Sequence, residues 1–237
     1  MERSMTKTLE TTKTKGADFD AVVVGAGFGG LYSVYKLRNE QSLNVKAYDG
    51  AGDVGGTWFW NRYPGALSDT ESFVYRYSFS GELLQKGHWK NRYLTQPEVL
   101  SYMNEVADTY DLRRSYEFNT RVTAARFNEK TGLWHVTTDK GQTVTAKYLI
   151  TGLGLLSATN LPTFKGIDSF KGQILHTGAW PEGVDLKGKR VGIIGTGSTG
   201  TQVITATANM LCRSGTRRRT RRRSLRRRPA MTTSGNR

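Results

Sequence analysis

A short apolar run that ends in closely spaced glycines restricts most strongly what this chain can fold into. The run is Asp20-Ala-Val-Val-Val24, and Gly25-Ala-Gly27-Phe-Gly-Gly30 follows it directly. From Phe28 to Glu40 apolar residues recur at near-helical spacing, and Val45–Tyr48 has the character of a second strand. A strand, a tight turn, a helix and a second strand make a βαβ unit, the opening of a doubly wound parallel sheet. We therefore expect an α/β fold of the Rossmann type.

The glycine spacing also predicts a ligand. In a G-x-G-x-x-G loop the first glycine permits the tight turn, the second lets the backbone approach a pyrophosphate, and the third allows close packing of helix and strand. The amino terminus of the helix that follows favours an anion. Asp49, at the end of the second strand, is placed to accept hydrogen bonds from a ribose. A turn that binds nothing is the alternative, but strand, helix and terminal acid together favour a dinucleotide.

A second loop repeats this pattern near the other end of the chain. Lys189-Arg-Val-Gly-Ile-Ile-Gly195 predicts a strand, and Gly195-Thr-Gly-Ser-Thr-Gly200 follows, with Ser198 and Thr199 able to donate to phosphate. The unusual sequence beyond does not confirm the helix that should come next. Two such loops in one chain indicate electrons passing from a soluble nicotinamide to a bound flavin.

The segment between the two expected nucleotide sites contains further elements. Thr95 and Glu98 form a capping-box pattern for a helix that should run to about Asp111. Val122–Phe127 and Leu133–Thr137 alternate as strands do, and they predict a small antiparallel layer inserted in the first nucleotide domain. Lys147–Gly152 returns to a buried strand.

A glycine- and aromatic-rich connection follows the second strand. It contains Gly55-Gly-Thr57-Trp58 and Asn61-Arg-Tyr-Pro-Gly-Ala-Leu-Ser-Asp69. The glycines would let the backbone lie against a flat ring, and Trp58 offers an aromatic wall. A packed aromatic Ω-loop without a ligand explains the same residues. The spacing alone does not decide between these interpretations.

A twelve-residue motif precedes the second loop and is the most specific signal in the chain. Residues 170–181 fit the pattern F-x-G-x-x-x-H-T-x-x-W-P at all six defined positions: Phe170, Gly172, His176, Thr177, Trp180 and Pro181. A lone histidine would be read as a linker or core residue. This pattern resembles the fingerprint of the Baeyer–Villiger monooxygenases, and the resemblance, strongest to their cyclohexanone-type members, extends from about Asp20 to Ala206. The related N-hydroxylating enzymes usually have serine after the histidine.

The resemblance implies roles for individual residues. Gly25, Gly27, Gly29 and Gly30 would hold the diphosphate of FAD, with Asp49, commonly glutamate in the family, on the ribose. The flavin side would be formed by Gly56, Thr57, Trp58 and Tyr75, and the backbone of Val122 would contact the adenine side. Asp69 would lie beside the flavin and orient the family's catalytic arginine. The loop for NADPH would consist of Gly195, Thr196, Gly197, Ser198, Thr199, Gly200 and Gln202.

The family reaction that the resemblance implies uses FAD, NADPH, O₂ and a ketone. NADPH reduces FAD, the reduced flavin combines with O₂ to a C4a-peroxyflavin, and this attacks the ketone to give an ester or lactone. The fingerprint residues belong to a linker that helps the domains move between these steps. The preference for NADPH over NADH rests on the resemblance alone. Alternatives are another two-dinucleotide flavin reductase or an N-hydroxylase.

Arginine is concentrated at the carboxyl end. Residues 213–237 contain eleven arginines and no acidic residue, and removing them from the net charge of +15 leaves +4 for residues 1–212. Three interpretations are open: contact with nucleic-acid phosphates, a solvated tail without a role, and out-of-frame translation. The change of character falls inside the helix that should complete the second nucleotide domain, which favours out-of-frame translation. A nucleic-acid partner is expected only through this tail.

We expect five segments along the chain. These are a disordered leader (1–19), an FAD-binding domain (20–165), a linker with the fingerprint (166–188), the beginning of an NADP-binding domain (189–208) and the arginine-rich tail (209–237). No residue can be matched to the family's catalytic arginine, which lies well beyond the second loop. We therefore expect a truncated or frameshifted form that does not oxygenate a ketone.

Composition excludes other classes. The longest apolar run, Ala21–Val24, is too short to span a bilayer, and the amino terminus has no apolar segment of a signal peptide. The single cysteine, Cys212, excludes an internal disulfide and the C-x-x-C pair of disulfide reductases. A cytoplasmic location is the default expectation.

Overall fold

The computed structural model describes residues 16–86 and 91–212. Most of the expected leader and nearly all of the arginine-rich tail lie outside these residues. The helices are α1 (Phe28–Val34), α2 (Thr57–Trp60), α3 (Gly81–Gln85), α4 (Gln96–Thr109) and α5 (Ser198–Cys212). The strands are β1 (Phe19–Val24), β2 (Val45–Tyr48), β3 (Leu67–Glu71), β4 (Tyr93–Thr95), β5 (Tyr116–Glu117), β6 (Val122–Asn128), β7 (Leu133–Thr138) and β8 (Thr143–Thr151).

Within the described residues, the main sheet has six strands in the order β5-β2-β1-β8-β7-β6. β5, β2, β1 and β8 are parallel, whereas β6 and β7 are antiparallel to their neighbours. The predicted βαβ unit is confirmed, since β1, α1 and β2 follow one another and the two strands pair from Ala21 to Val24. A separate small pair is formed by β3 and β4.

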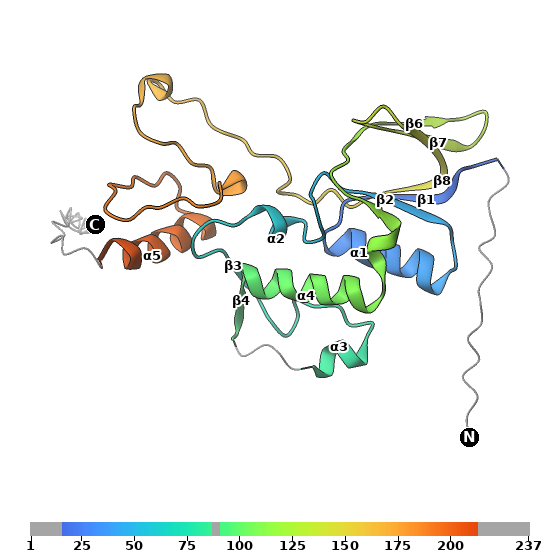
Figure 1. Cartoon of the computed structure of the whole chain (residues 1–237), viewed down its shortest axis with the longest axis horizontal. Coiled ribbons are helices and arrows are strands. Elements are labelled where there is room, and N and C mark those ends of the chain that lie inside the picture. Colours follow the sequence, from blue (N-terminus) through green and yellow to red (C-terminus); the bar gives the residue numbers. More distant parts are fainter. Residues whose placement is uncertain (1–15, 87–90, 213–237) are drawn as a thin grey trace, which may run out of the picture.

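The two faces of the parallel strands are covered differently, as Figure 1 shows. On one face, Ala21 and Val23 of β1 belong to a core with side chains of α1 and α4. On the other face, Val22 and Val24 pack with Val136 of β7 and with residues of β8. β1 is buried over almost its whole length because alternate side chains enter two different cores. The predicted antiparallel layer is therefore present, joined to the same sheet through the long strand β8.

The predicted helices on the first face are also present. α1 continues into a π-helical segment, Tyr35–Glu40, so helical structure extends to the residue at which the sequence pattern ends. At the start of α4, Glu98 Oε2 accepts hydrogen bonds from the backbone N–H of Thr95 at 2.8 Å and from its hydroxyl at 2.7 Å. The capping box is thus confirmed, and α4 ends close to the predicted position.

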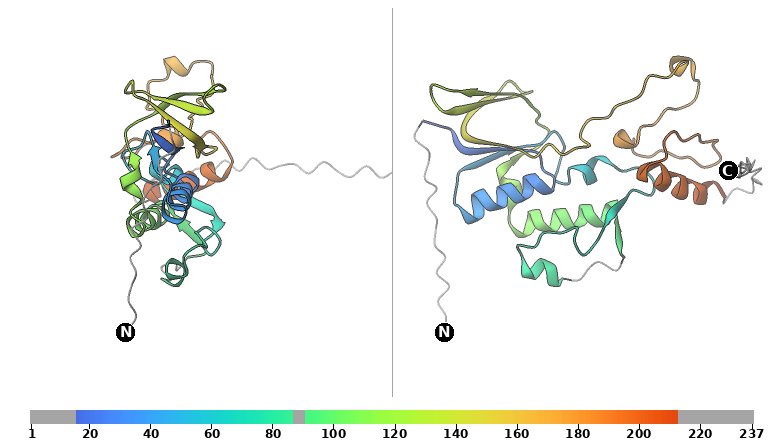
Figure 2. Two further views of the ribbon diagram at one scale, coloured as in Figure 1. Left: turned by 90° about the vertical axis from the view of Figure 1, so that its right-hand side faces the viewer. Right: turned by 180° about the vertical axis from the view of Figure 1, so that it is seen from behind.

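The region of the second loop lacks the predicted strand but contains a helix that the sequence left unconfirmed. Residues 189–195 form no strand, and Ile194 is 81% exposed. A parallel strand is stable only when neighbouring strands satisfy its backbone and cover its side chains, and no described strand adjoins this segment. The helix that the sequence did not confirm is present as α5, which runs without interruption across the expected boundary at 208/209. Figure 2 shows α5 and the preceding linker at the end of the molecule opposite the β6–β7 hairpin.

Candidate functional site

The first glycine loop connects β1 to α1 and can be formed only by glycine at two positions. Gly25 has φ +108°, and a Cβ there would lie 2.3 Å from the carbonyl oxygen of Gly152 at the end of β8. A Cβ on Gly30 would lie 1.7 Å from the carbonyl oxygen of Gly25. Gly29, by contrast, has open space around it. The loop is therefore compressed between β1, α1 and β8, the arrangement that the spacing predicts.

Asp49 lies directly after β2 and contacts this loop. Its Oδ2 accepts a hydrogen bond from the backbone N–H of Ala26 at 2.6 Å, and its Oδ1 accepts one from Ala51 at 2.6 Å. Each carboxylate oxygen has a further lone pair. Asp49 thus fixes the loop backbone, and its contact with a ribose stays a prediction.

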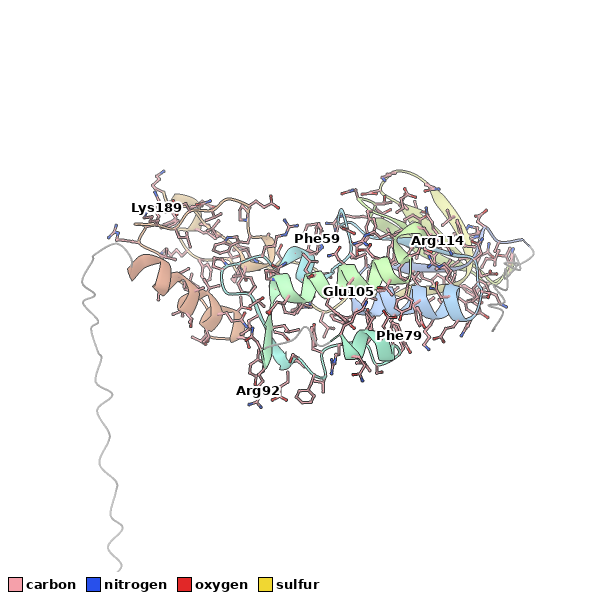
Figure 3. The ribbon with its side chains drawn as sticks, turned by 60° about the horizontal axis from the view of Figure 1, so that its bottom comes forward. Phe59, Phe79, Arg92, Glu105, Arg114 and Lys189 are labelled. Atoms are coloured by element: carbon pink, nitrogen blue, oxygen red, sulfur yellow. The ribbon has the colours of Figure 1, made fainter. Side chains whose placement is uncertain are left out.

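The aromatic connection packs against the first loop. Gly56, at φ +53°, approaches so closely that a Cβ would lie 2.7 Å from the Cα of Gly27. Thr57 is exposed at the start of α2, whereas Trp58 is buried and donates from Nε1 to the hydroxyl of Tyr75 at 3.1 Å. Figure 3 shows the labelled neighbour Phe59 on α2, between α4 and the linker. The predicted flavin-side residues are therefore gathered beside the first glycine loop, and Trp58 is also part of the main core.

Val122 occupies the beginning of β6 and packs against the second core. The neighbouring Arg121 reaches back to Gly50, where a Cβ would lie 2.9 Å from its Cγ. This places the start of β6 beside the end of β2, near Asp49. The contact of Val122 with adenine is not tested by this arrangement.

The second loop has the same local geometry as the first. Gly195 has φ +118°, and a Cβ on Gly200 would lie 2.4 Å from the carbonyl oxygen of Gly195. The first glycine and the sixth are thus in the same contact as Gly25 and Gly30. The loop keeps this form although the strand before it is missing, because α5 follows directly.

One open cavity of about 680 Å³ lies between the second loop and strand β3, which carries Asp69. The hydroxyl of Ser198 donates to Oδ2 of Asp69 at 3.4 Å. Both side chains are exposed, so the carboxylate and the loop face solvent across the cavity. The residues that line it are Gly65, Leu67, Ser68, Asp69, Tyr93, Thr196, Gly197, Ser198, Thr201, Gln202, Thr205 and Ala206.

Gln202 lies in the first turns of α5, and both the oxygen and the nitrogen of its side-chain amide form hydrogen bonds within the protein. Its Oε1 accepts a hydrogen bond from the hydroxyl of Tyr63 at 2.8 Å, and its Nε2 donates to the carbonyl of Leu67 at 2.9 Å. Gly65, at φ +79°, leaves room for α5, because a Cβ there would lie 2.8 Å from the Cβ of Ala206. We call these contacts of Tyr63, Gly65, Leu67 and Gln202 the α5 clasp. Tyr63 and Gly65 belong to the aromatic connection identified in the sequence, which predicted no role for either residue.

Similarity to known proteins identifies the family. The family model of flavin-binding monooxygenase-like proteins matches residues 20–217, more than four fifths of the chain. The chain belongs to the flavin-binding monooxygenase-like family. The match continues past Ala206, where the resemblance was expected to end.

Three relatives within this family illustrate its range. A Baeyer–Villiger monooxygenase from Pseudooceanicola batsensis is 80% identical over 199 residues, which are 84% of this chain and 36% of the relative. The phenazine N-monooxygenase PhzNO1 from Lysobacter antibioticus is 51% identical over 81% of this chain and 36% of its own length. The crystal structure of cyclohexanone monooxygenase from Rhodococcus sp. Phi1 bound to NADP⁺ has a TM-score of 0.78 at 59% identity, and it covers 81% of this chain and 36% of its own. The chain thus spans little more than a third of these relatives, and its resemblance to Baeyer–Villiger monooxygenases is confirmed.

The fingerprint of this flavin-binding monooxygenase-like chain lies in the linker between β8 and the second loop. Phe170 is 60% exposed, Pro181 is exposed, and Gly172 packs against the Phe170 ring. His176 Nδ1 accepts a hydrogen bond from the backbone N–H of Gly178 at 3.0 Å, which caps a short 3₁₀ turn, Thr177–Ala179, ahead of the half-buried Trp180. An ion pair between Arg62 and Glu182 connects the linker to the segment between α2 and β3.

The described residues also bear on metal binding and on membrane insertion. Residues 16–86 and 91–212 contain no group of histidine, cysteine, aspartate and glutamate that could hold a metal ion. No helix in these residues is long and apolar enough to cross a membrane. The nucleic-acid interpretation of the arginine-rich tail falls outside the described residues.

Proposed function

We propose that this chain carries the FAD site and the second nucleotide loop of a Baeyer–Villiger monooxygenase that converts a cyclic ketone to a lactone with NADPH and O₂. The observation that carries the proposal is the cavity at which Asp69 meets the second glycine loop. The two glycine loops have matching geometry, and the resemblance places Asp69, which lines the cavity with the second loop, beside the flavin.

The residues present fit FAD. Gly25 and Gly30 allow the tight packing that forms the turn, Gly29 leaves open space beside it, and the N–H groups at the start of α1 are donors of the kind that a diphosphate requires. Trp58 and Tyr75 supply an aromatic wall for the flavin side. When bound, FAD supplies the storage of electrons and the reaction with O₂.

The chain's own residues orient the reactants. Asp69 holds a carboxylate at the cavity, where it would orient a cation, as the family's acid does for the catalytic arginine. Ser198 and Thr199 at the start of α5 would donate to a phosphate of NADPH. The α5 clasp holds this helix beside β3, so that the second loop and the Asp69 carboxylate line the same cavity.

Binding of FAD is the first test. The purified 237-residue chain is titrated into FAD, and flavin fluorescence and absorbance are followed. We expect saturable binding at one site per chain. If circular dichroism shows that the chain is folded but the flavin fluorescence and absorbance do not change, the proposed FAD site is refuted.

The reaction itself is tested in a chimera. Residues 16–208 of this chain replace the matching segment of the Pseudooceanicola relative, which is 80% identical. We expect one lactone and one water from each cyclohexanone, O₂ and NADPH consumed, with the proton taken from solvent. The Asp69→Ala chimera is the matched control and should lose lactone formation. A folded, flavin-loaded chimera that forms no lactone, while the parent relative does, would contradict the proposal.

N-oxygenation is the second candidate because the phenazine N-monooxygenase is 51% identical. The same chimera, offered a phenazine in place of the ketone, distinguishes the two reactions by its product.

A further inference from the structure

Two tyrosine hydroxyls from separate segments of the chain donate to the backbone of the first glycine loop. Tyr116 Oη, on β5, donates to the carbonyl of Gly25 at 3.2 Å. Tyr77 Oη, from the segment between β3 and α3, donates to the carbonyl of Phe28 at 2.7 Å. The two carbonyls stand at either end of the four residues that turn the chain from β1 into α1.

Both hydroxyls are held in place by their surroundings. Tyr116 and Tyr77 are 8% and 9% exposed. The Tyr116 ring stacks on Phe118 with centroids 5.3 Å apart, and the Tyr77 ring lies 5.2 Å from Phe28 and 5.0 Å from Phe79. Figure 3 shows Phe79 beside α1 and α3. Burial raises the pKa of both phenols, so that each remains a hydrogen-bond donor throughout the neutral range.

Asp49 completes this set of contacts. Its bond to the N–H of Ala26 holds the residue between Gly25 and Gly27. Three side chains from separate segments of the chain therefore hold the loop backbone. Tyr116 binds the carbonyl of Gly25, Asp49 binds the N–H of Ala26, and Tyr77 binds the carbonyl of Phe28. A mobile loop would have to be ordered when an anion binds, and that cost would be subtracted from the affinity.

We propose that Tyr77 and Tyr116 are positioning residues that hold the glycine loop in the form that binds the diphosphate of FAD. Their hydroxyls are occupied by loop carbonyls, so they act through the backbone and not by contact with the cofactor. This inference rests on the proposed FAD site. It assigns a function to two residues that the glycine-loop motif does not contain.

The test compares FAD affinity with stability in four variants of the 237-residue chain: Tyr77→Phe, Tyr116→Phe, the double variant and Tyr48→Phe. Tyr48 is the matched control, because its hydroxyl is fully buried in the same domain and has no hydrogen-bond partner among the described residues. The dissociation constant for FAD is measured by fluorescence titration, and the stability of the cofactor-free chain is measured by urea unfolding.

We expect each loop variant to bind FAD about 5- to 20-fold more weakly, since a buried carbonyl loses its donor. The double variant should bind FAD more weakly than either single variant, because the two bonds hold different residues of the same turn. Tyr48→Phe should bind as the unsubstituted chain does. If one loop variant fails to fold, the other tests the proposal alone.

Two outcomes overturn the inference, and each is separate from failure of the proposed function. If the unsubstituted chain binds FAD and both loop variants bind it equally well, while only their stability falls, the hydroxyls serve folding and not the site. If Tyr48→Phe weakens binding as much as the loop variants do, the effect is a general one of the core. Failure of the unsubstituted chain to bind FAD refutes the proposed function itself.

Discussion

Ser198 Oγ donates to Oδ2 of Asp69 across 3.4 Å, and this contact joins two residues that are 129 positions apart in the sequence. Both residues are exposed, so the bond itself contributes little to stability. The position of α5 must therefore depend on other contacts. The α5 clasp supplies them through Tyr63, Leu67 and Gln202.

The clasp predicts how substitutions change the protection of α5 from hydrogen exchange. Tyr63→Phe and Gln202→Ala should each speed exchange of the amides in residues 198–208 by roughly 2- to 10-fold, since the first removes one partly buried hydrogen bond and the second removes two. The double variant should be no faster than the faster single variant, because both belong to one network. Exchange followed by mass spectrometry measures this, with Ile204→Ala on the exposed face as a control. Additive effects would contradict a shared clasp.

Glycine substitutions in the first loop should separate packing from helix propensity. Gly30→Ala places a Cβ 1.7 Å from a backbone carbonyl oxygen, so we expect a loss of at least about 2–3 kcal/mol in the free energy of unfolding. Gly29→Ala has open space and lies in α1, so stability should be unchanged or higher by up to about 1 kcal/mol. Urea unfolding of both variants checks this. Equal destabilisation would argue against the compressed loop.

The 237-residue chain itself should form no lactone from cyclohexanone, NADPH and O₂ when FAD is supplied. No residue in it can be matched to the arginine that supports the negative charge of the oxygenating species in the family, and a buried developing charge needs such a partner. Gas chromatography of the reaction extract measures the product, with the Pseudooceanicola relative as positive control. Lactone above the level of a protein-free reaction would show that this chain stabilises the negative charge of the oxygenating species without the family's arginine.

The geometry of the first glycine loop could be predicted because its determinants are local. β1, the glycine spacing, α1 and Asp49 lie within 31 residues, 19–49, and each follows from a short-range rule. The capping box of Thr95 and Glu98 was readable for the same reason. The contacts that refine the site are not local. Tyr116 and Gly25 are 91 positions apart, and no spacing rule connects them.

The second site shows where local rules fail. Residues 189–195 have the composition of a buried strand, but a strand forms only with neighbours, and composition does not state whether these are present. In the other direction, the unusual residues after Ala206 obscured a helix whose first turns are stabilised by the clasp. Tertiary contacts thus decided both outcomes against the sequence pattern.

The capping box also predicts how stability depends on pH. Hydrogen bonds from the Thr95 hydroxyl and backbone N–H lower the pKa of Glu98 in the folded chain. A carboxyl group whose pKa is lowered on folding stabilises the protein above its unfolded-state pKa, and this stabilisation is lost as the pH falls through the folded-state value. Glu98→Gln keeps the shape of the cap but has no charge. We expect the unsubstituted chain to exceed this variant by about 1 kcal/mol in the free energy of unfolding at pH 7. The difference should shrink below about pH 4.5 and vanish at lower pH, because protonated Glu98 then resembles the amide. Urea unfolding of both proteins between pH 3 and pH 7 measures it, and a difference that stays constant over this range would show that the charge of Glu98 contributes nothing to the cap.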